Sequence, residues 1–582
     1  MFNVQSFRVW LLGSASLAAA GLLQPASAQN ADQRINGIEQ EIRNLNTELQ
    51  RVRRELAAKD AAVRAAQADA TRAAEQSAAT DKAVANLRPP AGFGPGDGRA
   101  STSIGFGPSH PNIPSPRSNF TSLNTFANSE QEKRDGLVTS KGTFHIGGVT
   151  IQVGGFIEAA GIYRSRNQVA DIASNLNTAI PLAQSPLYHE GELRATARQT
   201  RVSALAEGDI DNDRHVAAYV EVDFLGAAGT ANTNESNSYN PRIRHLYTSY
   251  DDDSTGVHFL AGQSWSLATM FRLGVVPRAE NAPITIDAQY VPGFTWARQP
   301  QLRIAKDFGQ KLWIAASLES PQATYQIGPN GTGSNSGTAN FNNPGISQLT
   351  PGQPYSTDIA PDVILKVAAD PGFGHYELYG LGRLFADRVS VLGSGHNNTR
   401  LAGGVGGGVL LPVIPKMLDF ELSGLAGYGI GRYGSSQLPD ATISPTGASQ
   451  PLPAVHALVG LIGHPVPAVD IYSYVGTEQV GRQSFNTGGR AFGYGNPNYS
   501  NAGCDIELST ATCSANSSGI VQGTLGAWWR PIKGDFGTIQ TGLQYSYTRR
   551  SIFRGTTAVG GGGNNGSDDN MVFASFRYYP FQ

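Results

Sequence analysis

The stretch Ala218-Tyr219-Val220-Glu221-Val222-Asp223-Phe224 alternates apolar and polar side chains with a period of two. Successive side chains of an extended strand point to opposite faces, so the three apolar residues from Val220 share one face and the two carboxylates share the other. The same alternation recurs over residues 312–319 and 539–550. It predicts a sheet with one apolar face that extends from about residue 141 to the end of the chain.

The connections between these predicted strands alternate in length. Short turns fall near residues 208–213, 251–255, 308–310, 370–374, 412–417, 465–468 and 532–536. Longer polar stretches fall near residues 164–193, 227–241, 266–296, 321–360, 387–398, 431–453, 481–519 and 551–570. Seven short and eight long connections join sixteen strands of about ten residues each, the layout of a transmembrane barrel with short periplasmic turns and long external loops. A soluble sandwich would share the alternation within strands, but it would not require this layout.

The first 28 residues have the features of a signal peptide. Arg8 supplies a positive charge, residues 9–23 are apolar, and Ala26-Ser27-Ala28 matches a cleavage site. No later stretch of about 20 apolar residues exists, so we expect no transmembrane helix after export. An exported chain with a one-sided sheet favours an outer-membrane barrel.

In the predicted helical region 29–87, residues 35–66 carry a heptad pattern of apolar side chains. The positions that follow steps of three and four are Ile35, Ile38, Ile42, Leu45, Leu49, Val52, Leu56 and Val63. We predict an α-helical coiled coil in the periplasm, with a lone amphipathic helix as the alternative. Residues 88–140 are rich in Pro, Gly and Ser and predict a linker. The predicted fold class is therefore all-β, a transmembrane antiparallel β-barrel of about 16 strands over residues 141–582, preceded by this coiled coil.

The two cysteines, Cys504 and Cys513, lie nine positions apart in a polar stretch. An exported protein reaches an oxidising compartment, so they predict a disulfide that closes a surface loop. No histidine lies near them, and the spacing matches no zinc motif. We expect no metal site, cofactor or catalytic group.

If the apolar face meets lipid, a set of charged residues faces the lumen. These predicted pore-lining residues are Arg201, Glu207, Glu221, Asp223, Arg242, Arg244, Arg303, Glu319, Glu377, Arg383 and Arg550. Charges of both signs along a narrow passage favour hydrated polar solutes. The arginines favour carboxylates because a guanidinium binds them through two hydrogen bonds. For any single arginine, an ordinary charge at the rim is the alternative.

Three features do not fit simple alternation. Placing Arg242 and Arg244 in the lumen leaves His245 and Tyr247 toward lipid. Arg198 and Arg298 also fall on the apolar positions of their strands. For Arg198 and Arg298, a β-bulge or a place at the end of a strand would explain the departure.

The order of these parts, with several local stretches, resembles the DcaP-like family of trimeric outer-membrane porins. The stretches are Ile151-Gln152-Val153-Gly154-Gly155-Phe156-Ile157, Arg242-Ile243-Arg244-His245-Leu246-Tyr247, Leu260-Ala261-Gly262-Gln263-Ser264-Trp265-Ser266, Arg298-Gln299-Pro300-Gln301-Leu302-Arg303 and Gly429-Ile430-Gly431-Arg432-Tyr433. The resemblance implies a homotrimer, a periplasmic coiled coil that helps to hold it, and passive uptake of small, often anionic solutes.

The sequence therefore predicts a porin in the bacterial outer membrane, a passive channel for small hydrophilic solutes that include anions such as dicarboxylates. Its expected partners are two further copies of the chain, outer-membrane lipid and lipopolysaccharide, and the solutes. A formal net charge of -2 argues against nucleic acid as a partner. A structural anchor or adhesin mounted on the barrel, and an outer-membrane enzyme, are the alternatives, although the motifs G-x-S-x-G and H-E-x-x-H are absent from the sequence. The sequence leaves open which long loop, for example 321–360, narrows the pore.

Overall fold

The computed structural model describes residues 142–226, 240–329, 338–340, 356–556 and 566–581, with five residues nearer the N-terminus. Those five, at positions 40, 43, 47, 50 and 51, are helical and exposed. The predicted signal peptide, the apolar heptad positions and the linker lie outside the described residues, so the coiled coil stays a prediction. The chain divides into two units, residues 1–102 and 103–582, and only the second is described below.

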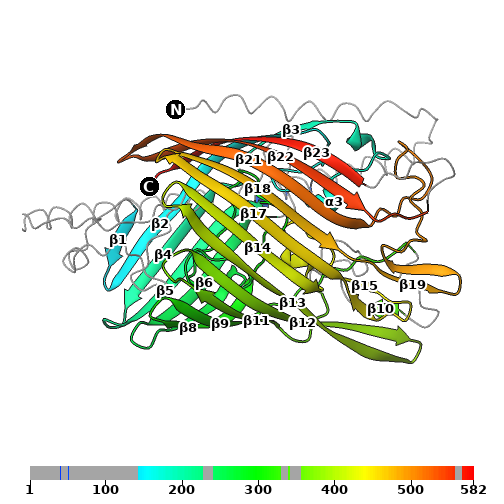
Figure 1. Cartoon of the computed structure of the whole chain (residues 1–582), viewed down its shortest axis with the longest axis horizontal. Coiled ribbons are helices and arrows are strands. Elements are labelled where there is room, and N and C mark those ends of the chain that lie inside the picture. Colours follow the sequence, from blue (N-terminus) through cyan, green and yellow to red (C-terminus); the bar gives the residue numbers. More distant parts are fainter. Residues whose placement is uncertain are drawn as a thin grey trace, which may run out of the picture. The chain divides into compact units, whose positions relative to one another are not determined.

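The second unit is a closed antiparallel β-barrel whose strands follow one another in sequence order around the wall (Figure 1). Its sheet has nineteen strands, of which β1 (Thr143–Ile146), β3 (Glu192–Thr196) and β10 (Thr338–Asn340) are short additions, so sixteen form the wall. Pairing of Ile157 on the first wall strand with Tyr578 on the last closes the barrel. The predicted strand number is confirmed. The wall strands are β2 (Val149–Arg164), β4 (Arg201–Asp209), β5 (Arg214–Gly226), β6 (Asn240–Asp252), β7 (Val257–Trp265), β8 (Arg298–Phe308), β9 (Leu312–Glu319), β11 (Asp362–Ala369), β12 (His375–Val391), β13 (Ser394–Ile414), β14 (Leu418–Tyr428), β17 (Pro453–Val466), β18 (Val469–Val480), β21 (Ser517–Gly534), β22 (Gly537–Ile552) and β23 (Gly566–Tyr579).

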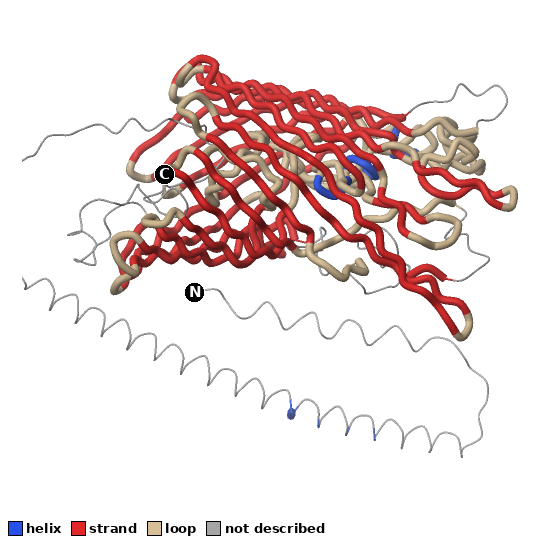
Figure 2. The backbone as a smooth tube through the Cα atoms, turned by 60° about the horizontal axis from the view of Figure 1, so that its bottom comes forward, coloured by secondary structure: helices blue, strands red, loops and turns tan. Residues whose placement is uncertain are grey.

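Short turns gather at one end of the barrel and the longer connections at the other (Figure 2). The long connections contain small elements: α3 (Leu176–Ala179), η2 (Pro186–Tyr188), η3 (Gly431–Tyr433), and the hairpins β15 (Ala441–Ile443) with β16 (Ser449–Pro451) and β19 (Gln483–Thr487) with β20 (Arg490–Tyr494). The predicted loop at 387–398 is wrong. There β12 and β13 continue pairing up to Val391 and Ser394, and a tight turn at Leu392 and Gly393 joins them. Gly393 has a φ of 77°, which glycine adopts without steric cost and which permits this turn.

The barrel exterior is apolar, as the period-two pattern predicts. On β9, the side chains of Leu312, Ile314 and Leu318 are exposed, whereas the alternate residues Trp313 and Glu319 are fully buried. A closed barrel leaves no unpaired strand edge, and an apolar outer surface suits hydrocarbon. Among the described residues, no helix combines the length and apolar character needed to span a bilayer.

The barrel interior is packed by the connection between β7 and β8, residues 266–297, which we call the inward loop. Its apolar side chains Leu267, Phe271, Ile286, Val291 and Phe294 are at most 2% exposed and pack against inward-facing wall residues. Figure 2 shows loop segments inside the wall of strands. Two large clusters of buried apolar side chains therefore lie where the inward loop contacts the barrel wall.

A β-bulge explains the irregular pattern on β6. In the β5–β6 pairing, Glu221 lies opposite His245 and Val222 lies opposite Ile243, so Arg244 is an extra residue. Arg244 and His245 are both 4% exposed and both point inward. The bulge places Arg242, Arg244, His245 and Tyr247 inside the barrel, because it shifts the alternation by one residue.

Arg198 and Arg298 occupy ends of strands, one of the two explanations that the sequence left open. Arg198 lies between β3 and β4, which both pair with β2, and its guanidinium bonds to the Asp171 carboxylate at 3.2 Å. Arg298 is the first residue of β8. Strict alternation therefore does not determine the face to which either side chain points.

Candidate functional site

The inward loop is anchored by carboxylates on three wall strands, β9, β12 and β18. The backbone N–H of Leu267 donates to Glu319 Oε1 on β9 at 2.8 Å, and the N–H of Phe271 donates to Glu377 Oε1 on β12 at 2.6 Å. Near the other end of the loop, the N–H of Gly293 donates to Glu478 Oε1 on β18 at 2.9 Å. Hydrogen bonds to charged acceptors are stronger than neutral ones, so these carboxylates fix the loop backbone.

The middle of the loop bonds to β21 and β22, the two strands that follow β18 around the wall. The Ile286 N–H donates to Gln544 Oε1 on β22 at 2.6 Å, and the indole N–H of Trp528 on β21 donates to the Ile284 carbonyl at 2.7 Å. The loop therefore crosses the lumen between strands far apart in the sheet. Residues 266–297 therefore enter the barrel and narrow its lumen.

Beside the inward loop lies a group of four guanidiniums, which we call the arginine cluster: Arg201, Arg242, Arg244 and Arg298. The Asp223 carboxylate on β5 accepts from Arg242 Nη2 at 2.7 Å and from Arg244 Nη1 at 3.0 Å. Glu221, two residues earlier, binds Arg244 and lies 4.0 Å from Arg201 Nη1. Four positive groups thus face two carboxylates.

Arg298 packs against two indole rings that are nearly perpendicular to each other. Its guanidinium carbon lies 4.9 Å from the ring centroid of Trp265 and 5.0 Å from that of Trp296, both within cation–π range. Among the described residues, its Nε and Nη1 atoms have no hydrogen-bond partner. A buried donor without a partner costs free energy that a ligand oxygen or a water could recover. Arg298 can therefore donate hydrogen bonds to an anionic solute.

The positive charges of the arginine cluster change the pKa of Tyr290 in the inward loop. Its hydroxyl lies 3.4 Å from Arg244 Nη2. Burial alone would raise the pKa of Tyr290, but the charges of Arg244, Arg201 and Arg298 outweigh burial and lower that pKa to about 8. The site thus stabilises a negative charge on a group that is ordinarily neutral.

The arginine cluster remains partly open. The side chain of Arg242 is 27% exposed and that of Arg201 is 11% exposed, whereas Arg244 is 4% exposed. A solute can therefore reach Arg242 and Arg201, while Arg244 holds the two carboxylates beneath them.

The structure brings five predicted pore residues into this site and places the others elsewhere on the inner wall. Arg201, Glu221, Asp223, Arg242 and Arg244 belong to the site, and Glu207 lies on the same strand face as Arg201 and acts electrostatically on Arg278 of the inward loop. Glu319 and Glu377 anchor the inward loop.

The three remaining predicted arginines bond to backbone carbonyls or carboxylates of loops and strands. Arg303 Nη2 donates to the Trp265 carbonyl at 2.7 Å. Arg383 binds the carboxylates of Asp362 at 3.1 Å and Asp440 at 2.9 Å, which joins it to the external connection 429–452. Arg550 Nη1 donates to the Ile180 carbonyl at 2.8 Å. These bonds fix internal and external loops over the lumen.

Sequence reasoning missed the aromatic part of the site and one buried cation. Trp265 and Trp296 lie at the two ends of the predicted connection 266–296 and Tyr290 lies within it, where a period-two pattern carries no information. Lys366 on β11, 1% exposed, lies between the outward Leu365 and Val367, so strand alternation alone could have placed it inside.

A disulfide lies at the end of the barrel that carries the long connections. Cys504 and Cys513 are bonded, with Cα atoms 4.8 Å apart. Cys504 packs with Leu182 and Ile552, and its carbonyl accepts the Gln184 N–H at 3.0 Å. The disulfide closes a loop within the connection 481–516, and the contacts of Cys504 tie that loop to the connection 165–191.

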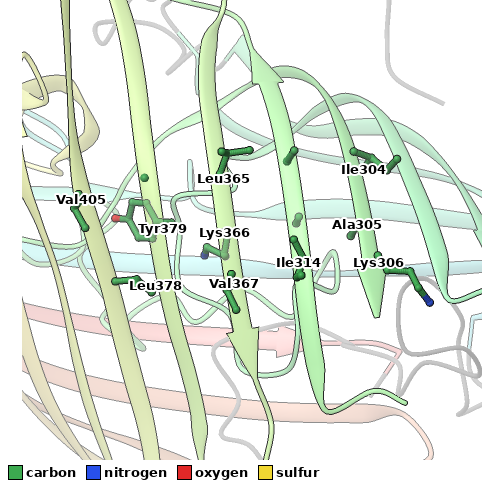
Figure 3. A pocket seen from close by; sticks show the side chains of 13 residues that line it. Ile304, Ala305, Lys306, Ile314, Leu365, Lys366, Val367, Leu378, Tyr379 and Val405 are labelled. Carbon is green, nitrogen blue, oxygen red and sulfur yellow. The ribbon is translucent and has the colours of Figure 1, made fainter. Parts of the chain in front are cut away.

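A groove of about 580 Å³ on the outside of the barrel is not the candidate site. It crosses β8, β9, β11, β12 and β13, and Figure 3 shows Ile304, Ile314, Leu365, Leu378 and Val405 along it. These side chains belong to the exposed apolar exterior. The groove therefore suits hydrocarbon, whereas the polar groups that could act on a hydrophilic solute converge inside.

Comparison with known proteins supports the fold. No protein-family model and no curated protein matches the sequence. Among solved structures, the outer membrane channel DcaP of Acinetobacter baumannii is 16% identical, with a TM-score of 0.51 over 74% of this chain and 98% of that chain. An anion-selective porin from Comamonas acidovorans is 9% identical, with a TM-score of 0.40 over 74% of this chain and 99% of that chain. OprB of Pseudomonas putida is 10% identical, with a TM-score of 0.40 over 74% of this chain and 94% of that chain. The chain shares its barrel fold with the DcaP channel.

Proposed function

We propose that this protein is an outer-membrane porin, a passive diffusion channel for small hydrophilic solutes with a preference for anions. One observation carries the proposal: inside a closed barrel with an apolar exterior, an inward loop meets an arginine cluster with more positive than negative groups. Such a barrel resides in an outer membrane, where its exterior contacts lipid and lipopolysaccharide. Short turns then face the periplasm.

The anion preference is argued from the charges. Among the described residues, the carboxylates of Glu221 and Asp223 pair with Arg201, Arg242 and Arg244, and Asp223 also acts electrostatically on Arg298. A surplus of fixed positive charge in a narrow, low-dielectric passage concentrates anions and repels cations. A carboxylate can bind guanidinium N–H groups bidentately, so dicarboxylates are the solutes we would test first.

The assembly we propose is a homotrimer. The heptads in residues 29–87 and the resemblance to trimeric porins support it, and the coiled coil would lie on the short-turn side, in the periplasm.

Liposome swelling tests the channel directly. Purified full-length protein, reconstituted in liposomes, should allow entry of small uncharged and anionic solutes at rates that fall with solute size. Absence of swelling with every solute would contradict a channel and favour a structural anchor.

Two neighbouring residues on opposite faces of β6 supply a matched pair for that assay. Arg242 points inward, and Ile243 is 45% exposed on the exterior. A bulky thiol reagent attached to Arg242→Cys should slow swelling several-fold, whereas the same reagent on Ile243→Cys should leave it unchanged. Equal swelling of the two labelled variants would show that solutes do not pass the arginine cluster.

A further inference from the structure

His375, the first residue of β12, lies between two carboxylates. Its side chain is 1% exposed, with Nδ1 2.8 Å from Asp370 Oδ1 and Nε2 3.0 Å from Glu377 Oε1. An ionised carboxylate only accepts hydrogen bonds, so the imidazole can satisfy both contacts only when both ring nitrogens carry a proton. A neutral ring would lose one of the two bonds.

The same two carboxylates hold the inward loop. Glu377 Oε1 accepts the Phe271 N–H at 2.6 Å, and Asp370 Oδ2 accepts the Gly274 N–H at 2.9 Å. Lys366 completes the arrangement, because its Nζ lies 2.6 Å from Glu377 Oε2 and 2.7 Å from the Thr269 carbonyl. Residues 269–274 are thus bonded to a four-residue cluster on β11, β12 and the turn between them.

Other charges near this cluster come from the neighbouring wall strands. Arg303 on β8 and Glu319 on β9 act electrostatically on Lys366. The Asp370 side chain is 13% exposed, whereas Glu377 and Lys366 are fully buried. Asp370 therefore offers a route for protons from the short-turn rim.

We propose that His375, Asp370, Glu377 and Lys366 form a proton-controlled latch that sets the position of the inward loop. His375 is a positioning residue, which acts through the two carboxylates. With both ring nitrogens protonated, the latch holds residues 269–274 against the wall; when the ring loses a proton, one carboxylate loses its donor and the loop segment loosens. The effect on ion current rests on the proposed channel function, but the effect on the loop backbone does not.

Another histidine provides a matched control. His464 on β17 also lies between two carboxylates, with Nδ1 2.6 Å from Asp470 and Nε2 3.5 Å from Asp419. Asp470 additionally binds Arg530 at 2.6 Å. His464 thus ties together elements of the rim, whereas His375 bonds to the anchors of the inward loop.

Hydrogen exchange of the full chain in detergent micelles tests the latch. At one pH, amides in residues 267–276 should exchange roughly tenfold faster in His375→Gln than in wild type, because one charge-assisted bond that orders their acceptors is lost. His464→Gln should leave that segment at the wild-type rate. Equal exchange of the segment in the two variants would overturn the proposal.

Single-channel recording over pH 7 to 10 provides a second readout. Wild type and His464→Gln should show more frequent current transitions as the pH rises, whereas His375→Arg, whose charge does not titrate, should stay constant. An arginine variant that titrates like wild type would overturn the latch, even if His375→Gln fails to fold. No current from any variant would remove the channel proposal and leave the exchange result to decide the latch.

Discussion

The Glu478 carboxylate on β18 accepts a hydrogen bond from the backbone N–H of Gly293, with 2.9 Å between Oε1 and the nitrogen. The same oxygen accepts the Ser436 N–H at 3.0 Å. One wall residue therefore fixes the inward loop and the external connection 429–452 together.

Removing this carboxylate should loosen both segments. Glu478→Ala leaves the Gly293 and Ser436 amides without their acceptor, at a cost of about 1–3 kcal/mol for each buried donor. We expect a larger and noisier single-channel conductance and a lower unfolding temperature. Glu478→Gln keeps an acceptor oxygen and should stay close to wild type, as should Glu190→Ala, whose side chain is exposed. A wild-type conductance from Glu478→Ala would contradict this role.

Anion preference should weaken at alkaline pH. Because the pKa of Tyr290 is lowered to about 8, the phenol is neutral below that pH and becomes a phenolate above it. The phenolate adds a third negative group opposite the four arginines. Reversal potentials measured from pH 7 to 9 should shift toward lower anion selectivity in wild type and much less in Tyr290→Phe. An identical shift in both proteins would exclude Tyr290 as its origin.

Stability should also fall as the pH rises from about 4 to 7. Burial raises the pKa of Asp287 in the inward loop to about 7, whereas an unfolded Asp has a pKa near 3.9. Between these values the folded state holds a proton that the unfolded state releases, so the free energy of unfolding decreases with pH from about 4 to 7. Asp287→Asn keeps an acceptor for the Gln289 N–H and should flatten that dependence. Urea titrations at pH 5 and pH 8 measure the free energy of unfolding of both proteins. The same difference between the two pH values in wild type and Asp287→Asn would exclude Asp287 as its origin.

Deleting residues 30–85 should weaken the trimer and spare the barrel. If the heptads hold three chains together, the shortened protein should migrate as a monomer on unheated gels while it remains heat-modifiable, as a folded barrel is. An intact trimer after the deletion would show that the barrel alone holds the assembly.

The barrel wall was predictable because strand alternation and turn chemistry are local properties of sequence. The outward Ile314 and inward Trp313 follow directly from period two, and the short turns fall where Asp, Gly and Pro interrupt it. The hairpin around Gly393 was missed because its polar residues were interpreted as a loop, although they pair with one another.

The site was less predictable because its geometry depends on long-range contacts. A single inserted residue at Arg244 moves His245 and Tyr247 inward, and no local pattern reveals the bulge. The position of the inward loop depends on acceptors far along the chain, as when Ile286 bonds to Gln544, 258 residues away. Charge type was therefore evident from the sequence, but the grouping of charges was not.

The reversal potential of the wild-type protein in a planar bilayer under a KCl gradient tests the central claim most directly. We expect stepwise ion conductance and a reversal potential on the anion-selective side. The triple variant Arg201→Gln, Arg242→Gln, Arg298→Gln should move it toward cation selectivity, and Arg490→Gln on the exposed β19–β20 hairpin should leave it unchanged. Absence of conductance, or a cation-selective potential that the triple variant does not alter, would contradict the account.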